Sequence, residues 1–560
     1  MNEPCWLSGR MGHFVALDDL AVLSLTIIDA ADTLGVSTAS VRNWIKAGYL
    51  VSTDRGCITR DSFDGFIENV AGQEKLVARA NKSQKDGHDH GALCSRFRQL
   101  VKQDEFDSDQ IGDEYQASLS NTYRNQEGIY YTPDGIIERY FADLPADRRA
   151  LTFCDPCCGS GNFILAALDQ GFAPENIFGF DIDPVAVAIT KRRILERTGF
   201  DSPNIQRADF LKASLQGRPP RFDVIFTNPP WGKKLSKAQK QSYAIQFAAG
   251  SSSDTCSLFF CAALSRLQPG GYLGFLLPDA FFNVAAFADA RGRALALDIK
   301  SLMDFGKPFP GLVTKAKGIV LQNQANRNEP ILCEGLTDTA VRTPASFQQN
   351  PKAILNFSCS PQAAAVIAHL YEVEHLTLAD HGRFGLGIVT GNNKKYCVSS
   401  PRAGYLPVYK GADLQPGLLR KPSVFIPADF SLYHQVAPQE LYHAPEKLIY
   451  RFISSRLVFH VDTSQSYFLN SVNMLVPEPD FPITGQQLCQ LLNSRVMNWL
   501  FQSIFETHKV LRADIGVLPI HTKYFKQYEE FDEAAYANFL GIEETTEGDY
   551  RIKGRGKGAS

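Results

Sequence analysis

Four consecutive residues near the middle of the chain could hold a flat ring that carries an amine. Asn228, Pro229, Pro230 and Trp231 follow an apolar run, Asp223–Thr227, which predicts a strand. The lone pair of such an amine is delocalised into the ring, so a site that activates the amine must accept its N–H bonds. The side-chain carbonyl of Asn228 and the peptide carbonyl of Pro229 are two acceptors, and Trp231 offers a stacking face. The prolines stiffen the loop, so positioning would carry the catalysis.

A glycine-rich loop comes earlier, after the predicted strand Leu151–Cys154. It reads DPCCGSGNF over residues 155–163 and leads into a predicted helix, Ile164–Leu168. Gly159 and Gly161 let the backbone approach a ligand where a Cβ atom would clash. In an open parallel sheet, ligands bind beyond the carboxyl ends of the strands, where this loop is expected. The spacing departs from the G-x-G-x-x-G pattern of dinucleotide sites, so a pyrophosphate is not the expected ligand.

Carboxylates follow the other predicted strands. Asp181 comes directly after the predicted strand Ile177–Phe180, where it could accept hydrogen bonds from both hydroxyls of a ribose. A surface acid or a helix cap is the alternative for any one of these carboxylates. The occurrence of Asp155, Asp181 and Asp209 in order, each at or just after a strand, favours a ligand site. No metal site is predicted, because the clustered cysteines of the glycine loop could not all reach one ion without destroying the loop.

The two motifs, in this order, resemble motifs I and IV of S-adenosylmethionine-dependent methyltransferases that act on amino groups. Together with the long C-terminal region, they are similar to the gamma class of DNA adenine-N6 methyltransferases of restriction-modification systems, the TaqI-like group. This resemblance implies S-adenosylmethionine as the cofactor and double-stranded DNA as the partner. A cognate restriction endonuclease would be a second partner.

The resemblance also assigns residues to the cofactor and to the target base. The cofactor residues are Thr132, Asp155, Pro156, Gly159 and Gly161 at the methionine end, Asp181 at the ribose, Asp209 and Phe210 at the adenine, and Asn228 beside the methyl donor. A target adenine in a duplex must be flipped out of the helix to reach such a site. Phe309 resembles the second aromatic residue that holds the flipped base together with Trp231. A core phenylalanine at the end of a strand is the alternative for Phe309.

Two other functions remain open at this stage. The N-P-P-aromatic motif also occurs in methyltransferases that modify RNA amines or protein glutamine, although the long C-terminal region disfavours that class. A DNA-binding protein with a degenerate methyltransferase scaffold is the second alternative. The intact Asp155, Gly161, Asp181, Asp209 and Asn228 argue against that alternative.

The pattern of the whole chain predicts several domains. Strands alternate with helices in the middle of the chain, which predicts a Rossmann-like α/β domain with a mixed seven-stranded sheet. The N-terminal region resembles the winged helix-turn-helix modules of MerR-type and excisionase proteins, with Thr26 capping a helix at Ile27–Leu34. A small helical cap without DNA contact is the alternative. The expected boundaries are 1–71 for the winged module, 72–92 for a linker, 93–335 for the methyltransferase domain, 336–525 for an α+β target-recognition domain and 526–560 for a tail.

The composition is that of a folded protein in water. Hydrophobic residues make up 44% and charged residues 21% of the 560 positions. No apolar run reaches the roughly 20 residues that span a bilayer, and Met1–Arg10 lacks the pattern of a secretory signal. We therefore expect no membrane partner and a cytoplasmic location, where the twelve cysteines would be reduced. The net charge of −3 leaves nucleic-acid binding open, because a basic groove can form on a neutral protein.

Overall fold

The computed structural model forms two compact units. One comprises residues 1–87, 389–397 and 429–435, and the other comprises 88–388, 398–428 and 436–560. The structure describes residues 24–34, 41–42, 44–45, 49–52, 57–59, 62–63, 66, 96–97, 108–118, 132–216, 219–232, 235–309, 314–416 and 418–554. The predicted linker, 72–92, and residues 555–560 of the predicted tail lie outside the described residues.

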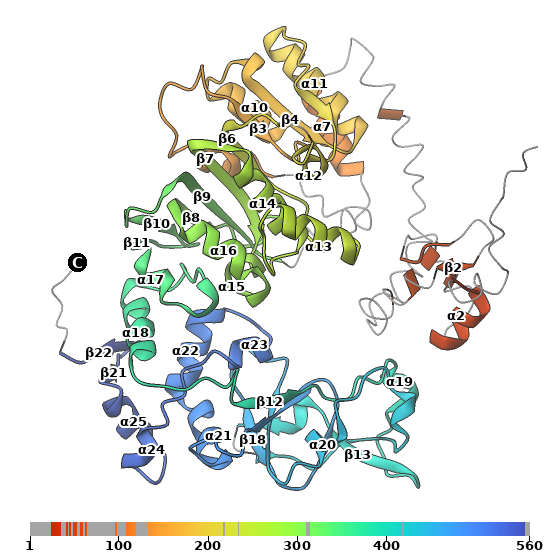
Figure 1. Ribbon diagram of the computed structural model, residues 1–560, viewed down its shortest axis with the longest axis vertical. Coiled ribbons are helices and arrows are strands. Elements are labelled where there is room, and N and C mark those ends of the chain that lie inside the picture. Colours follow the sequence, from red (N-terminus) through yellow and green to blue (C-terminus); the bar gives the residue numbers. More distant parts are fainter. Residues whose placement is uncertain are drawn as a thin grey trace, which may run out of the picture. The chain divides into compact units, whose positions relative to one another are not determined.

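A mixed sheet of nine strands forms the centre of the larger unit (Figure 1). Its order is β11-β10-β8-β9-β7-β6-β3-β4-β5. The strands are β3 (Phe153–Asp155), β4 (Ile177–Asp181), β5 (Ile205–Arg207), β6 (Phe222–Thr227), β7 (Leu267–Pro278), β8 (Leu297–Asp304), β9 (Ala316–Ala325), β10 (Ile331–Glu334) and β11 (Thr339–Arg342). Strands β3 to β7 run parallel to one another, whereas β9 is antiparallel to both β7 and β8. The predicted α/β class is therefore confirmed.

The sheet has two strands more than predicted. The hairpin of β10 and β11 adds to the edge of the seven expected strands, with β10 parallel to β8. The sheet thus continues past residue 335, and Phe347 and Phe357 are buried in the same core. The expected domain boundary at 335 was too early, because β11 has only four residues, two of them polar, and carries little strand signal of its own.

Helices cover the sheet, and the one that follows β4 has clear start and stop signals in its sequence. Helix α11 spans Pro184–Thr198. It begins with Pro184 after the cap residue Asp183, whose side chain accepts from the backbone N–H of Val185, and it ends at Gly199 in a left-handed conformation. The other helices of this domain are α7 (Ser108–Ser118), α9 (Asp134–Tyr140), α10 (Asn162–Asp169), α12 (Phe210–Ala213), α13 (Lys237–Gln246), α14 (Thr255–Ser265), α15 (Ala280–Asn283), α16 (Ala288–Leu295) and α17 (Ala345–Gln348).

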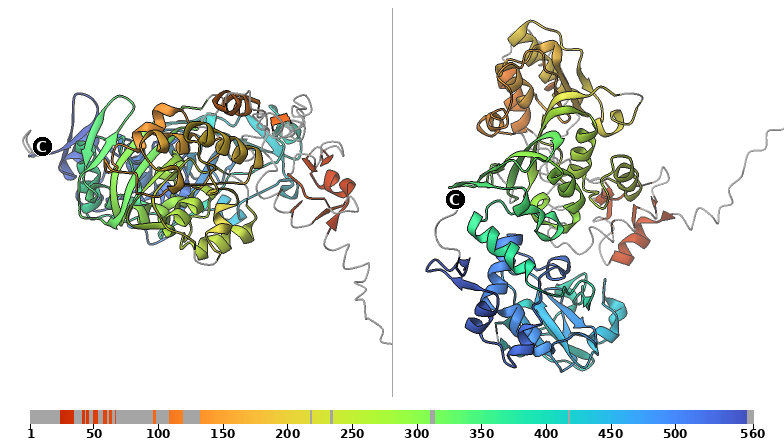
Figure 2. Two further views of the ribbon diagram at one scale, coloured as in Figure 1. Left: turned by 90° about the horizontal axis from the view of Figure 1, so that it is seen from above. Right: turned by 60° about the vertical axis from the view of Figure 1, so that its left-hand side comes forward.

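Apart from residues 389–397 and 429–435, which belong to the other unit, the elements from α18 onward form a lobe of helices and short sheets (Figure 2). One sheet is antiparallel and has the order β12-β20-β17-β18, and a second has the order β16-β13-β19. The strands are β12 (Gly382–Gly385), β13 (Tyr405–Tyr409), β16 (Val424–Pro427), β17 (Lys447–Arg451), β18 (Phe459–Asp462), β19 (Tyr467–Phe468) and β20 (Val472–Pro477). The main helices are α18 (Pro361–Glu372), α21 (Gly485–Asn493), α22 (Arg495–Phe505) and α23 (Arg512–Ile515). This is the α+β character expected of the C-terminal domain.

Residues 526–554 are folded, which corrects the prediction of a tail. They contain α25 (Glu533–Phe539) and the hairpin of β21 (Ile542–Glu544) and β22 (Tyr550–Ile552). Four side chains of this segment are buried in the core of the C-terminal lobe, namely Tyr536, Leu540, Ile542 and Tyr550. The prediction failed because many acidic and basic residues separate these apolar positions and mask their pattern.

The N-terminal region has a small core of its own. Helix α2 (Ile27–Leu34) has the predicted limits, and the hydroxyl of Thr26 accepts the backbone N–H of Asp29 at 3.1 Å. Strands β1 (Ser24–Leu25) and β2 (Ile58–Thr59) pair antiparallel. The buried residues include Ala30, Val41, Trp44, Leu50, Ile58, Phe63 and Phe66. Among the described residues of the whole chain, no helix is both long and apolar enough to cross a lipid bilayer.

Candidate active site

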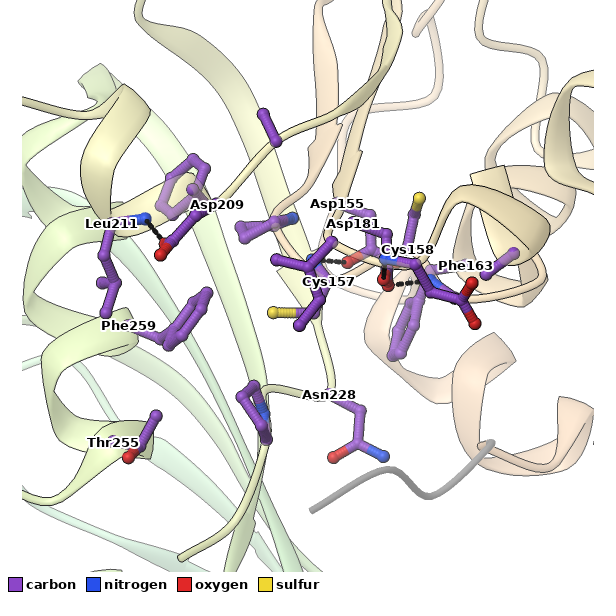
Figure 3. Close-up of a pocket in the computed structure, with 18 of the residues that line it drawn as sticks. Asp155, Cys157, Cys158, Phe163, Asp181, Asp209, Leu211, Asn228, Thr255 and Phe259 are labelled. Atoms are coloured by element: carbon purple, nitrogen blue, oxygen red, sulfur yellow. Dashed lines mark hydrogen bonds between the residues drawn. The ribbon is translucent and has the colours of Figure 1, made fainter. Parts of the chain in front are cut away.

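A cavity opens beyond the carboxyl ends of the central parallel strands (Figure 3). Its empty volume is about 1040 Å³ with the solvent at its mouth included, which is room for a nucleoside-sized ligand. Asp155 and Asp181 lie on one side of it, Asp209 and Phe259 lie on the other, and Asn228 lies between them at its edge. The predicted residues that line it are Thr132, Asp155, Pro156, Gly159, Asp181, Asp209, Phe210, Asn228 and Pro230. Both motifs therefore reach the same cavity.

Asp155 is buried where the glycine loop leaves β3. Its carboxylate accepts the backbone N–H of Cys157 at 3.0 Å and the hydroxyl of Thr227 at 2.6 Å. Burial raises the pKa of Asp155 to about 7; these two hydrogen bonds lower it in part, and the charge of Asp181 raises it further. The loop thus holds a carboxyl that a cationic ligand group would ionise.

The other two acids stabilise the backbone around the cavity. Asp181 accepts the N–H of Gly159 at 2.9 Å and the N–H of Asp183 at 2.8 Å, so it ties the glycine loop to the end of β4. Asp209 caps α12 and accepts the N–H of Leu211 at 3.0 Å. The helix-cap alternative therefore describes Asp209 correctly, and the same side chain also lines the cavity.

Gly161 shapes the loop and does not line the cavity. Its φ of 97° lies in the left-handed region, and a Cβ atom there would stand 2.9 Å from Cγ2 of Thr190. The Thr190 hydroxyl donates to the carbonyl of Gly159 at 2.8 Å, and Arg193 donates to the carbonyl of Ser160 at 2.9 Å. The residues of α11 therefore hold the loop from behind, which requires glycine at 161.

Two aromatic rings form the wall on the side of Asp209. Phe210 and Phe259 stack with centroids 6.1 Å apart and planes 17° from parallel. Phe210 is 1% exposed and Phe259 is 8% exposed. Such a wall suits a flat apolar ring in the cavity beside an acceptor such as Asp209.

Trp231 and Phe309 contact each other away from the cavity lining. Their ring centroids are 5.6 Å apart at 75°, and the indole N–H of Trp231 donates to the carbonyl of Leu276 at 3.3 Å. Both rings are nearly buried, and as they stand no base fits between them. The expectation of two rings with a base between them is therefore not met in this conformation. The indole turns inward because its N–H finds an acceptor on β7. Pro229 is likewise absent from the lining.

Several residues that line the cavity were not predicted from the sequence. Thr255 and Phe259 come from α14 and lie four residues apart on one helical face. Asp183, the cap residue of α11, lines the cavity and accepts a hydrogen bond from the hydroxyl of Tyr115 on α7. Asn162 donates to the backbone carbonyl of Thr132 at 3.2 Å. The four-residue spacing indicates that Thr255 and Phe259 share one face of α14, but it does not show whether that face meets the edge of the sheet.

The methyltransferase and C-terminal regions each match a family model. Residues 106–294 match the N-6 DNA methylase family, and residues 406–520 match the TaqI-like C-terminal specificity domain. The fold is also similar to that of the type IIL restriction-modification enzyme MmeI, which was solved in complex with DNA. That likeness has a TM-score of 0.53 and 13% identity, and covers 77% of this chain and 73% of MmeI.

Curated relatives extend the similarity over most of the chain. The type II methyltransferase M.XamI of Xanthomonas campestris pv. amaranthicola is 25% identical over 202 residues, which are 34% of this chain and 38% of that protein. The type II methyltransferase M.VspI of Vibrio sp. (strain 343) is 48% identical over 399 residues, which are 71% of this chain and 97% of M.VspI. The chain therefore belongs to the type II methyltransferases, as an adenine-specific DNA methyltransferase with an N-6 DNA methylase domain and a TaqI-like specificity domain.

Proposed function

We propose that this enzyme transfers a methyl group from S-adenosylmethionine to N6 of an adenine flipped out of a specific site in duplex DNA. The observation that carries the proposal is that Asn228 lines the same cavity as Asp155, Asp181 and Asp209. The methyltransferase family implies this methyl donor. The donor, when bound, supplies an electrophilic methyl group on a sulfonium.

The lining of the cavity fits the cofactor's separate chemical parts. Asp155 is buried and has a pKa of about 7, and it lies beside the backbone of Gly159. Its carboxyl suits the ammonium of the methionine portion. Asp181 lines the cavity at the end of β4, where its carboxylate suits the ribose hydroxyls. Asp209 and Phe210 suit the adenine amine and the adenine ring.

The catalytic residues act on the target amine by accepting hydrogen bonds from its two N–H groups. The amide oxygen of Asn228 and the carbonyl of Pro229 would each accept one N–H, which favours a pyramidal nitrogen whose lone pair can attack. Pro229 and Pro230 hold these acceptors in place, so little reorganisation is needed at the moment of reaction. Phe309 and Trp231 would contact the flipped base once their rings separate.

The C-terminal lobe would read the DNA site. Lys410 and Arg451 line a shallow basic cavity there, with an empty volume of about 500 Å³, and are candidates for contact with phosphates. Lys394 and Lys395, on α19 (Asn393–Tyr396), are further candidates. The N-terminal module, 1–71, would dock on DNA or protein as a winged helix-turn-helix. A restriction-modification system with a cognate endonuclease is the proposed setting.

Methyl transfer with a labelled donor tests the proposal. We expect label in duplex DNA and at N6 of adenine, and none in RNA or protein. Sequencing of modified bases in genomic DNA from expressing cells would identify the target site. The Asn228→Ala variant should bind S-adenosylmethionine as the wild type does and transfer no methyl group. Persistent transfer by this variant would refute the role of Asn228.

A further inference from the structure

The C-terminal end of α22 is capped by side chains of the methyltransferase domain. Asn283 of α15 donates through Nδ2 to the carbonyl of Phe505 at 2.8 Å. Asn356 donates through Nδ2 to the carbonyl of Ser503 at 3.1 Å. The last carbonyls of a helix have no partner within the helix, so these two amides complete α22. The C-terminal end of α22, in the specificity domain, is thus hydrogen-bonded to the catalytic domain.

Lys317 of β9 adds a buried charge to this junction. Its ammonium lies 3.0 Å from Asp279 and 3.1 Å from Glu506, the residue that ends α22. The Lys317 side chain is only 2% exposed. Burial alone would lower the pKa of Lys317, but the charges of Glu506 and Asp279 outweigh it and raise the pKa above its usual value. A buried cation depends strongly on each partner that remains beside it.

Glu506 adopts an unusual backbone conformation at this point. Its φ of 45° and ψ of 39° place it in the left-handed region, which is unfavourable for a residue other than glycine. Glycine is the common residue at such a helix end. Here a glutamate occupies the position and its carboxylate reaches Lys317. The ion pair is therefore made by a glutamate at a position where the backbone conformation alone would favour glycine.

Lys317 also sits at the base of the segment that carries Phe309. Strands β8 and β9 are antiparallel, and Asp304 and Lys317 are register partners next to their connection. The Asp304 carboxylate lies 4.0 Å from the Lys317 ammonium. Phe309 follows within that connection and contacts Trp231 of the catalytic loop. A displacement of Lys317 would therefore shift the rings of Phe309 and Trp231.

On the other side, the chain after Glu506 reaches the basic cavity of the specificity domain. The N–H of Ser454 donates to the carbonyl of His508 at 3.0 Å, and the N–H of Val510 donates to the carbonyl of Phe452 at 2.8 Å. These bonds tie the chain after Glu506 to residues 452–454. Arg451, which lines the basic cavity, directly precedes them.

We propose that the ion pair between Lys317 and Glu506 couples engagement of DNA by the specificity domain to the seating of the target base by Phe309 and Trp231. Both charged residues are positioning residues, because they act through the rings and do not touch the substrate. The inference rests on the proposed function of the basic cavity and of Phe309.

Two variants of Glu506 separate coupling from folding. Glu506→Gln removes the charge and keeps the shape. Glu506→Gly also removes the charge but suits the left-handed backbone, so a loss of rate that both variants share cannot come from backbone strain at this position. The matched control is Glu544→Gln, which breaks the 2.7 Å ion pair between Glu544 and Arg495 at the opposite end of α22. Each full-length protein is tested on its mapped site, once fully paired and once with the target adenine mispaired.

We expect both Glu506 variants to slow single-turnover transfer on the paired duplex by about ten- to a hundred-fold. Their dissociation constants for DNA and S-adenosylmethionine should be unchanged, and the mispaired duplex, whose adenine flips easily, should recover most of the rate. Glu544→Gln should act as the wild type. Unchanged transfer, an equal loss on both duplexes, or an equal loss in the control would overturn the coupling. Failure of the wild type to methylate adenine would instead refute the proposed function.

Discussion

The hydroxyl of Thr227 donates a 2.6 Å hydrogen bond to the carboxylate of Asp155 and so joins the strand before the catalytic loop to the strand before the glycine loop. Strands β3 and β6 are parallel neighbours, and both residues are their last ones. Thr227 is fully buried. The bond therefore fixes the two motifs relative to each other across the floor of the cavity.

Replacing Thr227 tests this connection. Thr227→Val keeps the shape of the side chain but removes the donor of one hydrogen bond to the Asp155 carboxylate. A hydrogen bond to a charged group contributes about 1.5–3 kcal/mol. We expect the dissociation constant for S-adenosylmethionine, measured by calorimetry, to rise by at least about ten-fold. Thr227→Ser retains the hydroxyl and should bind as the wild type does. Equal affinities for all three proteins would show that the bond does not support the cofactor site.

The raised pKa of Asp155 predicts a pH dependence of cofactor binding. Because the folded pKa is about 7 and the ordinary value is 3.8, folding favours the protonated carboxyl, and the stability of the ligand-free protein should fall as pH rises between these values. Binding of an ammonium favours the ionised form. Affinity for S-adenosylmethionine should therefore rise from pH 5.5 to pH 7, by up to about ten-fold per pH unit. Calorimetry with Asp155→Asn should give weaker binding that no longer depends on pH in this window.

Gly161 and Gly171 form a matched pair for testing the glycine loop. Both have positive φ, 97° and 90°, but a Cβ atom at 161 meets Thr190 and a Cβ atom at 171 meets nothing within 4 Å. Gly171→Ala should cost only the backbone strain of about 1–2 kcal/mol. Gly161→Ala should lower the free energy of unfolding by more than this. It should also weaken cofactor binding, because Thr190 must move and release the carbonyl of Gly159. Denaturant unfolding and calorimetry would measure the two effects. Equal losses in both variants would contradict the role given to Thr190.

Elements with strong local signals could be predicted from the chain alone. The limits of α11 follow from Pro184 at its start and Gly199 at its end. Asp155, Asp181 and Asp209 could be placed at one sheet edge because parallel strands present their carboxyl ends together. These features depend on residues that are close in sequence or on a rule of topology.

Features that depend on distant packing could not be predicted. Phe259 reaches the cavity because α14 packs against this edge of the sheet, and its spacing alone does not show which face turns inward. The orientation of Trp231 depends on an acceptor at Leu276, which lies on another strand. Strand β11 forms through pairing with β10 although it is only four residues long. In each case the partner, and not the residue itself, determines the outcome.

Phe309 allows the role of the two rings to be tested. If its ring holds the target base, Phe309→Leu should keep the packing against Trp231 and slow single-turnover methylation by about ten-fold or more, because base–aromatic stacking is worth about 1–3 kcal/mol. Cofactor affinity should not change, since Phe309 does not line the cofactor cavity. A fully active leucine variant would instead assign Phe309 to the core.

The folded C-terminal segment predicts a loss of stability that a tail would not show. Tyr536 of α25 is fully buried, and its hydroxyl bonds to Nδ1 of His521 at 2.7 Å, while the other ring nitrogen of His521 bonds to the carbonyl of Leu370 on α18. Tyr536→Ala removes a large aromatic side chain and leaves Nδ1 of His521 without its hydrogen-bond partner, so we expect a loss of about 3–5 kcal/mol in the free energy of unfolding. Tyr528→Ala is the control, because Tyr528 is 40% exposed and should cost far less. Urea unfolding of both variants measures the difference. Similar small losses would mean that residues 533–552 do not contribute to the core of the specificity domain, whereas a large loss for Tyr536 alone would make this segment an integral part of it.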